Sequence, residues 1–204
     1  MLLHEKLKPF NLILASASPR RRELLANSGL KFTLAEKFNC PEEFSEELAV
    51  DEVAAHLALR KSHAYPKELQ QNDILLTADT VVIVDNTILG KPANREEAIK
   101  MLSTLSGRTH SVVTGVALRM TDRIHFFSVS SSVSFRELEE EEIIYYIDTF
   151  KPYDKAGAYG IQEWIGYVAI ESIEGSFFNV MGLPIQRLYV ELEEFINRYL
   201  RLSK

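Results

Sequence analysis

Two serines and a run of arginines stand where an apolar segment near the N-terminus ends. Ser16 and Ser18 carry hydroxyl groups, and Arg20 and Arg21 can each bind phosphate oxygens through two parallel hydrogen bonds. Ser18 as N-cap and Pro19 after it predict the start of a helix, which offers unpaired backbone N–H groups and the positive end of its dipole. The pattern therefore suits a polyanionic ligand. A capped helix with solvated arginines is the alternative explanation of the same residues.

Asp79 is the one acidic residue between two apolar runs, residues 74–78 and 81–84. This position predicts a carboxylate inside a mostly buried strand. Aspartate is seldom fully buried unless it is paired, hydrogen-bonded or bound to a metal. The functional interpretation makes Asp79 a metal ligand or the base that orients a water molecule. A turn, or an internal hydrogen bond to Thr80, explains the residue equally well on this pattern alone.

Two lysines and a pair of glutamates complete the set of charged candidates. Lys91 lies between a glycine and a proline, in a rigid turn where structure alone does not require a cation. Lys61 falls at the edge of the buried face of a predicted helix, where its aliphatic stem can also simply cover apolar surface. Glu42 and Glu43 stand in an acidic segment that also fits a solvated loop.

The segment from residue 151 to 162 combines alternating charges with small residues that let the backbone approach a ligand. It contains Lys155 and ends at Gln162, whose amide offers a paired donor and acceptor that could read the edge of a nucleobase. A surface Ω-loop without a ligand is the alternative.

The elements that must position these residues alternate between strands and helices. This alternation predicts an α/β protein with a twisted mixed central sheet flanked by helices. No repeat and no long Gly/Ser hinge interrupts it, so we expect a single domain over residues 1–204. The expected strands are 11–15, 31–35, 74–84, 88–89, 111–118, 125–135 and a last one near 167–173. The expected helices are 19–29, 50–65, one from Asn94 to Gly107, 139–149 and a terminal one from Pro184, with loops at 39–47 and 175–182.

Composition narrows the class of protein. A net charge of −6 disfavours binding of a nucleic-acid polymer through a broad basic face. The single cysteine, Cys40, excludes an internal disulfide and suits a reducing compartment. No run approaches the ~18 apolar residues that span a bilayer. We therefore expect a cytoplasmic protein with neither a nucleic-acid polymer nor a membrane as partner. Walker A, Gly-x-Gly-x-x-Gly and His-Glu-x-x-His motifs are absent from the sequence.

Taken in order, six blocks of residues resemble those of the Maf-like nucleoside triphosphate pyrophosphatases, from Leu12 to about Leu188. The blocks are LASASPRR (14–21), ADT (78–80), GKP (90–92), LSGRTH (105–110), DKAGAYGIQ (154–162) and NVMGLP (179–184). The resemblance implies an inosine-triphosphatase-like architecture with two lobes and a cleft. It also implies hydrolysis of a nucleoside triphosphate between its α and β phosphorus atoms, with a divalent metal, Mg²⁺ or Mn²⁺.

The resemblance also implies roles for individual residues. Asp79 would be the catalytic acceptor, and a loop glutamate would assist with the metal or the water. The spacing to Lys61 favours Glu42 for this role, while Glu43 lies adjacent. Both Asp79 and Glu42 are the expected metal ligands. Phosphate contacts would come from Ser16, Arg21, Lys61 and Lys91, and further substrate contacts from Ser18 and Lys155.

Substrate preference within the family is expected to follow a few positions. Arg20, Thr80 and Gln162 match the branch that acts on dTTP and UTP, and modified pyrimidine nucleotides are a further expected class. The chain departs from the family pattern at Glu163-Trp164, where small residues are common. A nucleotide-binding protein that regulates cell division or septum formation through a partner is the alternative function. A homodimer through a sheet edge or a helix face is compatible with the sequence, which does not specify one.

Overall fold

The computed structural model describes residues 1–202 and divides into two compact units. Unit 1 comprises Met1–Asp79, Thr114–Val129 and the chain from Gly182 onward, and unit 2 comprises Thr80–Val113 and Ser130–Met181. Within the described residues, no helix combines the length and the apolar composition that crossing a bilayer requires.

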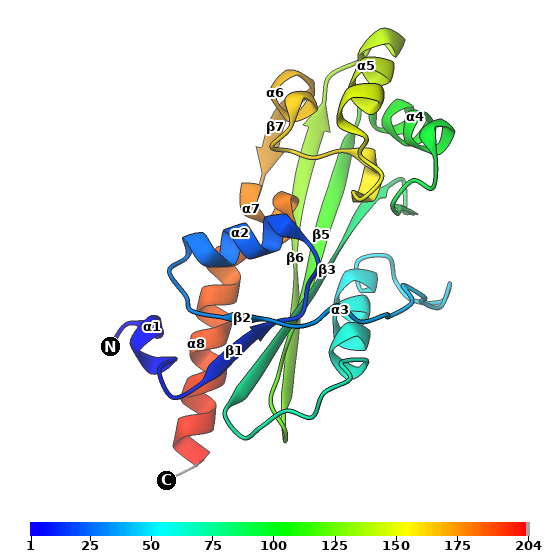
Figure 1. Cartoon of the computed structure of the whole chain (residues 1–204). Coiled ribbons are helices and arrows are strands. Elements are labelled where there is room, and N and C mark those ends of the chain that lie inside the picture. Colours follow the sequence, from blue (N-terminus) through cyan, green and yellow to red (C-terminus); the bar gives the residue numbers. More distant parts are fainter. Residues whose placement is uncertain (203–204) are drawn as a thin grey trace. The chain divides into compact units, whose positions relative to one another are not determined.

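Helices and strands alternate along the chain (Figure 1). The helices are α1 (Leu3–Lys6), α2 (Pro19–Asn27), α3 (Val53–His63), α4 (Arg95–Leu105), α5 (Glu140–Phe150), α6 (Trp164–Ala169), α7 (Phe177–Met181) and α8 (Ile185–Leu202), with a 3-10 turn, η1, at Ala156–Ala158. The strands are β1 (Asn11–Leu14), β2 (Thr33–Leu34), β3 (Asp73–Val84), β4 (Thr87–Leu89), β5 (Thr109–Arg119), β6 (Ile124–Phe135) and β7 (Ile170–Glu174).

The seven strands form one sheet in the order β2-β1-β3-β5-β6-β7, with β4 paired to β3. Strand β1 runs parallel to both β2 and β3, whereas the β3–β4 and β6–β7 pairs are antiparallel. The predicted mixed sheet with helices around it is therefore confirmed. Both β1 and the first half of β3 are buried along almost their whole length, as parallel strands usually are.

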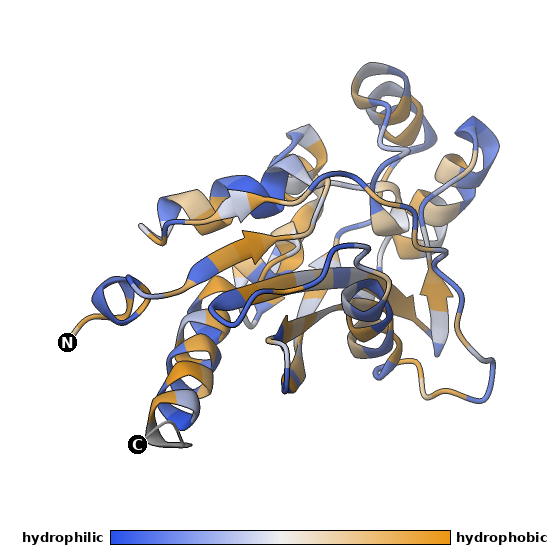
Figure 2. Ribbon diagram, turned by 60° about the horizontal axis from the view of Figure 1, so that its bottom comes forward, coloured by the Kyte–Doolittle hydropathy of each residue, from blue (hydrophilic) through white to orange (hydrophobic). Residues whose placement is uncertain are grey.

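In unit 1, local signals fix the β1–α2 segment. The Ser18 side chain accepts a hydrogen bond from the backbone N–H of Arg21, and Pro19 occupies the first helical position, as the sequence predicts. The helix ends before Gly29, whose φ of +76° suits a residue without a Cβ. Figure 2 shows α8 as a helix of alternating hydrophobic and hydrophilic stretches, in keeping with the buried positions Leu188 and Leu192.

The core of unit 2 lies between its strands and the helices α4 and α5. Its largest buried side chains include Phe135 and Tyr146. Asp85 and Asn86 both have positive φ angles, which is the conformation of a tight two-residue hairpin turn between β3 and β4. Asn94 caps α4 by accepting the N–H of Glu97, as predicted.

Three expectations about elements are wrong or incomplete. The expected strand near 167–173 begins only at Ile170, because residues 164–169 form α6. A short apolar run does not distinguish a strand from a buried helical turn, so periodicity could not separate them. The expected loop 175–182 contains α7, and the expected strand 31–35 is reduced to Thr33–Leu34.

Candidate active site

The carboxyl ends of parallel strands in unit 1 bring the first candidate residues together. Leu14 of β1 is paired with Leu76 of β3, and the N–H of Ala15 bonds to the carbonyl of Leu76. Ser16 therefore follows β1 at the point where β3 runs on toward Asp79. Ligands of α/β proteins bind at such strand ends, where the chain leaves the sheet for a helix.

Arg21 is anchored to the main chain beside Asp79. Its Nε donates to the carbonyl of Gly182 at 2.7 Å, and one terminal nitrogen donates to the carbonyl of Ala78 at 2.9 Å. Burial lowers the pKa of Arg21 from its usual value, and the charges of Asp79 and Glu42 act in the opposite direction. The guanidinium is thus held by two carbonyls from distant parts of the sequence, within the electrostatic reach of both carboxylates.

Lys61 bridges the two carboxylates that the sequence singled out. Its Nζ lies 2.6 Å from Oδ2 of Asp79 and 3.0 Å from Oε1 of Glu42. Asp79 is only 5% exposed, so its charge needs a nearby partner, and Lys61 provides one. The structure therefore places Lys61 between the expected catalytic residue and the expected loop glutamate.

The position of Lys61 follows from how α3 packs on the sheet within unit 1. The hydroxyl of Thr77, buried in β3, donates to the carbonyl of Ala58 in α3 at 2.7 Å. Asp79 is two residues beyond Thr77 and shares its face of the strand, while Lys61 is three residues beyond Ala58 and shares its face of the helix. The contact between Thr77 and Ala58 thus aligns the next pair along both elements, Asp79 and Lys61.

Glu42 and Glu43 point to different partners. The carboxylate of Glu42 pairs with Lys61, whereas Glu43 faces Arg60, with a carboxylate oxygen 3.7 Å from the guanidinium. The side chain of Glu43 is 76% exposed. Of the two adjacent glutamates, Glu42 is therefore the one that lies beside Asp79 and Lys61.

Four candidate residues, Thr80, Lys91, Lys155 and Gln162, belong to unit 2. The loop after β4 and the turn η1 are joined there, because the N–H of Gly157 donates to the carbonyl of Gly90 at 3.0 Å. This bond ties the segment of Lys91 to the segment between Lys155 and Gln162. Lys91 is exposed, whereas Lys155 is buried in ion pairs with acidic neighbours.

The side-chain oxygen of Gln162 lacks a hydrogen-bond donor among the described residues. Its Oε1 atom is buried and accepts no hydrogen bond from any residue between 1 and 202. A buried acceptor without a donor costs about 1–3 kcal/mol.

Two carboxylates are available for the divalent metal that the family resemblance implies. In the described part of the chain, no group of three or more His, Cys, Asp or Glu side chains is arranged to hold a metal ion. Mg²⁺, however, is usually held by one or two carboxylates together with substrate phosphates and water. Asp79 and Glu42, both in contact with the same positive charge, provide such a pair. The residues present therefore fit a metal that arrives with its substrate.

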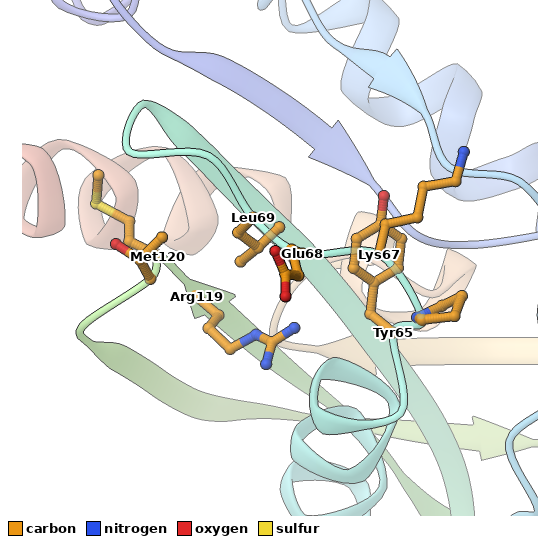
Figure 3. Close-up of a pocket in the computed structure, with 8 residues that line it drawn as sticks. Tyr65, Lys67, Glu68, Leu69, Arg119 and Met120 are labelled. Carbon is orange, nitrogen blue, oxygen red and sulfur yellow. The ribbon is translucent and has the colours of Figure 1, made fainter.

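A separate pocket in unit 1, of about 410 Å³, contains none of the predicted site residues. It is lined by residues 65–69, which follow α3, and by residues 119–121 at the end of β5. Figure 3 shows Arg119 on one side of it and Tyr65 on the other. Burial lowers the pKa of Arg119.

Sequence reasoning missed several residues that hold the candidates in place. Thr77 gave a weak signal, as a polar residue two positions before Asp79 on the same strand face. Gly182 and Tyr146 gave none that indicated their contacts, because these contacts join segments more than ten residues apart: the Gly182 carbonyl accepts from Arg21, and the Tyr146 hydroxyl accepts from the N–H of Gly160.

Comparison with known proteins gives consistent matches over almost the whole chain. The profile of the family described as Maf-like protein matches residues 11–195. A dTTP/UTP pyrophosphatase of Porphyromonas gingivalis is 51% identical over 193 residues, which cover 94% of this chain and 97% of that protein. A dTTP/UTP pyrophosphatase of Parabacteroides distasonis is 48% identical over 191 residues, or 94% and 99% of the two chains. Among solved structures, a HAM1 protein from Coxiella burnetii aligns with a TM-score of 0.46 and 17% identity over 91% of this chain and 99% of that one.

Proposed function

Because the chain belongs to the Maf-like protein family, we propose that it hydrolyses dTTP and UTP to the nucleoside monophosphate and pyrophosphate. The dTTP/UTP pyrophosphatases that it resembles at 48–51% identity support this substrate class. The observation that carries the proposal is the cluster of Asp79, Lys61, Glu42 and Arg21 at the carboxyl ends of parallel strands in unit 1.

Asp79 is proposed as the general base. Water attacks the α-phosphorus, its proton passes to the Asp79 carboxylate, and the bond from the α-phosphorus to the bridging oxygen breaks, so that pyrophosphate leaves. A carboxylate that is 5% exposed and paired with Lys61 is fixed in position before the substrate binds. This fixed position is what a base needs in order to orient a water molecule.

Phosphate binding is proposed for the residues at the start of α2 and for Lys61. Ser16 and Ser18 offer hydroxyl groups, Arg21 offers a guanidinium held by two main-chain carbonyls, and the first turn of α2 adds its dipole. Charge builds up on the leaving pyrophosphate, and prearranged cations stabilise that charge more in the transition state than in the ground state. Lys91, and Lys155 by family resemblance, are proposed as further substrate contacts.

Asp79 and Glu42 are proposed as the residues that hold the divalent metal, Mg²⁺ or Mn²⁺. When bound, the metal neutralises phosphate charge and lowers the pKa of a coordinated water. The protein contributes two carboxylates that both contact the ammonium group of Lys61: Glu42 lies on a loop and Asp79 on a strand.

Pyrimidine preference is proposed to depend on Arg20, Thr80 and Gln162. The amide chemistry of Gln162 supports this role, since its oxygen can accept from the N3–H donor that uracil and thymine carry and cytosine lacks.

Release of pyrophosphate from a panel of nucleotides tests the proposal. Purified protein with Mg²⁺ or Mn²⁺ is incubated separately with dTTP, UTP, CTP, ATP and GTP, and pyrophosphate and monophosphate are quantified. We expect equal amounts of the two products, with dTTP and UTP turned over fastest. A protein that releases no pyrophosphate from any triphosphate, or that prefers a purine, contradicts the proposal.

A further inference from the structure

A buried ion pair lies in the same segment of unit 2 as Gln162. Lys155 is 8% exposed, and its Nζ lies 2.7 Å from Oδ1 of Asp154 and 3.0 Å from Oε1 of Glu163. The Asp154 side chain is 59% exposed, whereas that of Glu163 is 20% exposed. Water screens the first pair strongly and the second much less, so Glu163 is the partner that matters more for the buried ammonium.

The second carboxylate oxygen of Glu163 is held by a tyrosine. The hydroxyl of Tyr146 donates a short hydrogen bond to Oε2 of Glu163 and accepts the backbone N–H of Gly160 at 3.0 Å. Burial and the neighbouring carboxylate raise the pKa of Tyr146 far above its usual value, so the hydroxyl keeps its proton. Through this one hydroxyl, Glu163 is connected to the backbone three residues before it.

The same groups enclose the turn in which Gln162 stands. The N–H of Glu163 donates to the carbonyl of Gly160 at 3.0 Å, which makes Gln162 the third residue of a four-residue turn. A Cβ atom on Gly160 would lie 2.9 Å from the carboxyl carbon of Glu163 and 3.0 Å from Cε of Lys155. The ion pair therefore packs against Gly160, the first residue of the turn that contains Gln162.

We propose that Glu163 is a positioning residue that fixes the amide of Gln162 and so sets the selectivity for uracil or thymine over cytosine. The proposal rests on the proposed function of Gln162 as the group that reads the base. Uracil and thymine present an N3–H donor beside a carbonyl acceptor, while cytosine presents an N3 acceptor beside an amino donor. A glutamine amide serves either pattern if it can turn over, and only one if it is held.

Glu163→Gln tests the proposal, because it removes the charge but keeps the size of the side chain. We expect the ratio of kcat/KM for UTP to that for CTP to fall about 10-fold, the discrimination carried by one well-placed pair of hydrogen bonds. Tyr146→Phe removes the hydroxyl from both Gly160 and Glu163 and should lower the ratio in the same direction. Glu141→Gln and Tyr145→Phe, both at exposed positions of α5, are the matched controls and should keep the wild-type ratio.

A variant that is only less well folded loses activity on UTP and CTP by the same factor. An unchanged ratio in both Glu163→Gln and Tyr146→Phe therefore overturns the proposal, and a loss confined to these two variants supports it. Equilibrium binding of UMP and CMP gives a second ratio that needs no hydrolysis. If the wild-type protein binds UMP more tightly than CMP yet releases no pyrophosphate, the proposed function fails. The role of Glu163 is then still tested by the ratio of UMP to CMP binding in Glu163→Gln and Tyr146→Phe. Equal binding of UMP and CMP by the wild-type protein overturns the role as well.

Discussion

Replacing Gly115 with alanine tests whether the packing of α3 on β5 places Lys61 at Asp79. A Cβ atom at Gly115 would lie 2.2 Å from the backbone carbon and oxygen of Ala54 and 2.3 Å from the nitrogen of Ala55. Ordinary van der Waals contact begins at 3.4 Å, so helix and strand must separate by about 3.4 − 2.2 = 1.2 Å to reach it. Because backbone atoms form the contact, no side-chain rotation can relieve it.

The displacement would reach the candidate site through the helix itself. Lys61 is seven residues, or about two turns, beyond Ala54 on the same helix. Its Nζ now lies 2.6 Å from Oδ2 of Asp79, so a shift of 1.2 Å lengthens the distance to as much as 2.6 + 1.2 = 3.8 Å. A misplacement of about 1 Å can cost up to ~100-fold in rate. Overpacking should also lower the free energy of unfolding by about 1–3 kcal/mol.

Two measurements separate these effects. Thermal unfolding should show a melting temperature lower by about 2–12 °C, and steady-state pyrophosphate release from UTP at a temperature well below the transition should show the loss in rate. Ser128→Ala, at an exposed position of β6, is the control and should change neither. If Gly115→Ala unfolds earlier but keeps the wild-type rate, the link from α3 to the site is refuted. If it changes neither property, the close packing is refuted too.

Three further outcomes are expected. Asp79→Asn should lower kcat for UTP about 10²–10⁴-fold while UMP still binds, and near-normal turnover would exclude the base role. Removing divalent metal with a chelator should weaken equilibrium binding of UTP far more than that of UMP, and equal affinities with and without metal would contradict the proposed ligands. Burial lowers the pKa of His110 from 6.5 to about 4. Neutral His110 therefore stabilises the fold above pH 6.5, and this contribution is lost as the pH falls toward 4. Urea titrations at pH 7 and 4.5 should show that His110→Gln loses about 2–3 kcal/mol less than the wild type between these values, and identical losses would refute the assignment.

The parts of the fold that depend on neighbours in sequence could be predicted. The Ser18 cap and Pro19 define the start of α2, and Asp85-Asn86 defines a hairpin, because each signal acts within three or four residues. The mixed sheet follows from the order of these elements. The boundary between α6 and β7 could not be predicted, because Ile165 and Ala169 are buried in the core and would be apolar in either conformation.

The candidate site was predictable as a set of residue types but not as a set of contacts. A buried carboxylate demands a partner, so Asp79 indicated a nearby ion pair, hydrogen bond or metal, yet nothing local identified Lys61 as that partner. The choice depends on Gly115 and Thr77, which seat α3 on the sheet. The hydrogen bond from Tyr146 to Glu163 is likewise a tertiary contact, between α5 and the loop before α6, so no local pattern predicts it.

The charges of unit 1 explain why a site for a polyanion contains two carboxylates. Arg20, Arg21 and Lys61 contribute three positive charges, and Asp79 and Glu42 remove two of them, so these five side chains together carry a net charge of about +1. A nucleoside triphosphate carries about three to four negative charges near neutral pH, since the second ionisation of a phosphate lies near 6. In the proposed complex, Lys91 and cations that accompany the substrate would balance the rest of that charge. If Asp79 and Glu42 have the proposed roles, these carboxylates weaken binding of the bare nucleotide and make binding and proton transfer depend on the same divalent ion.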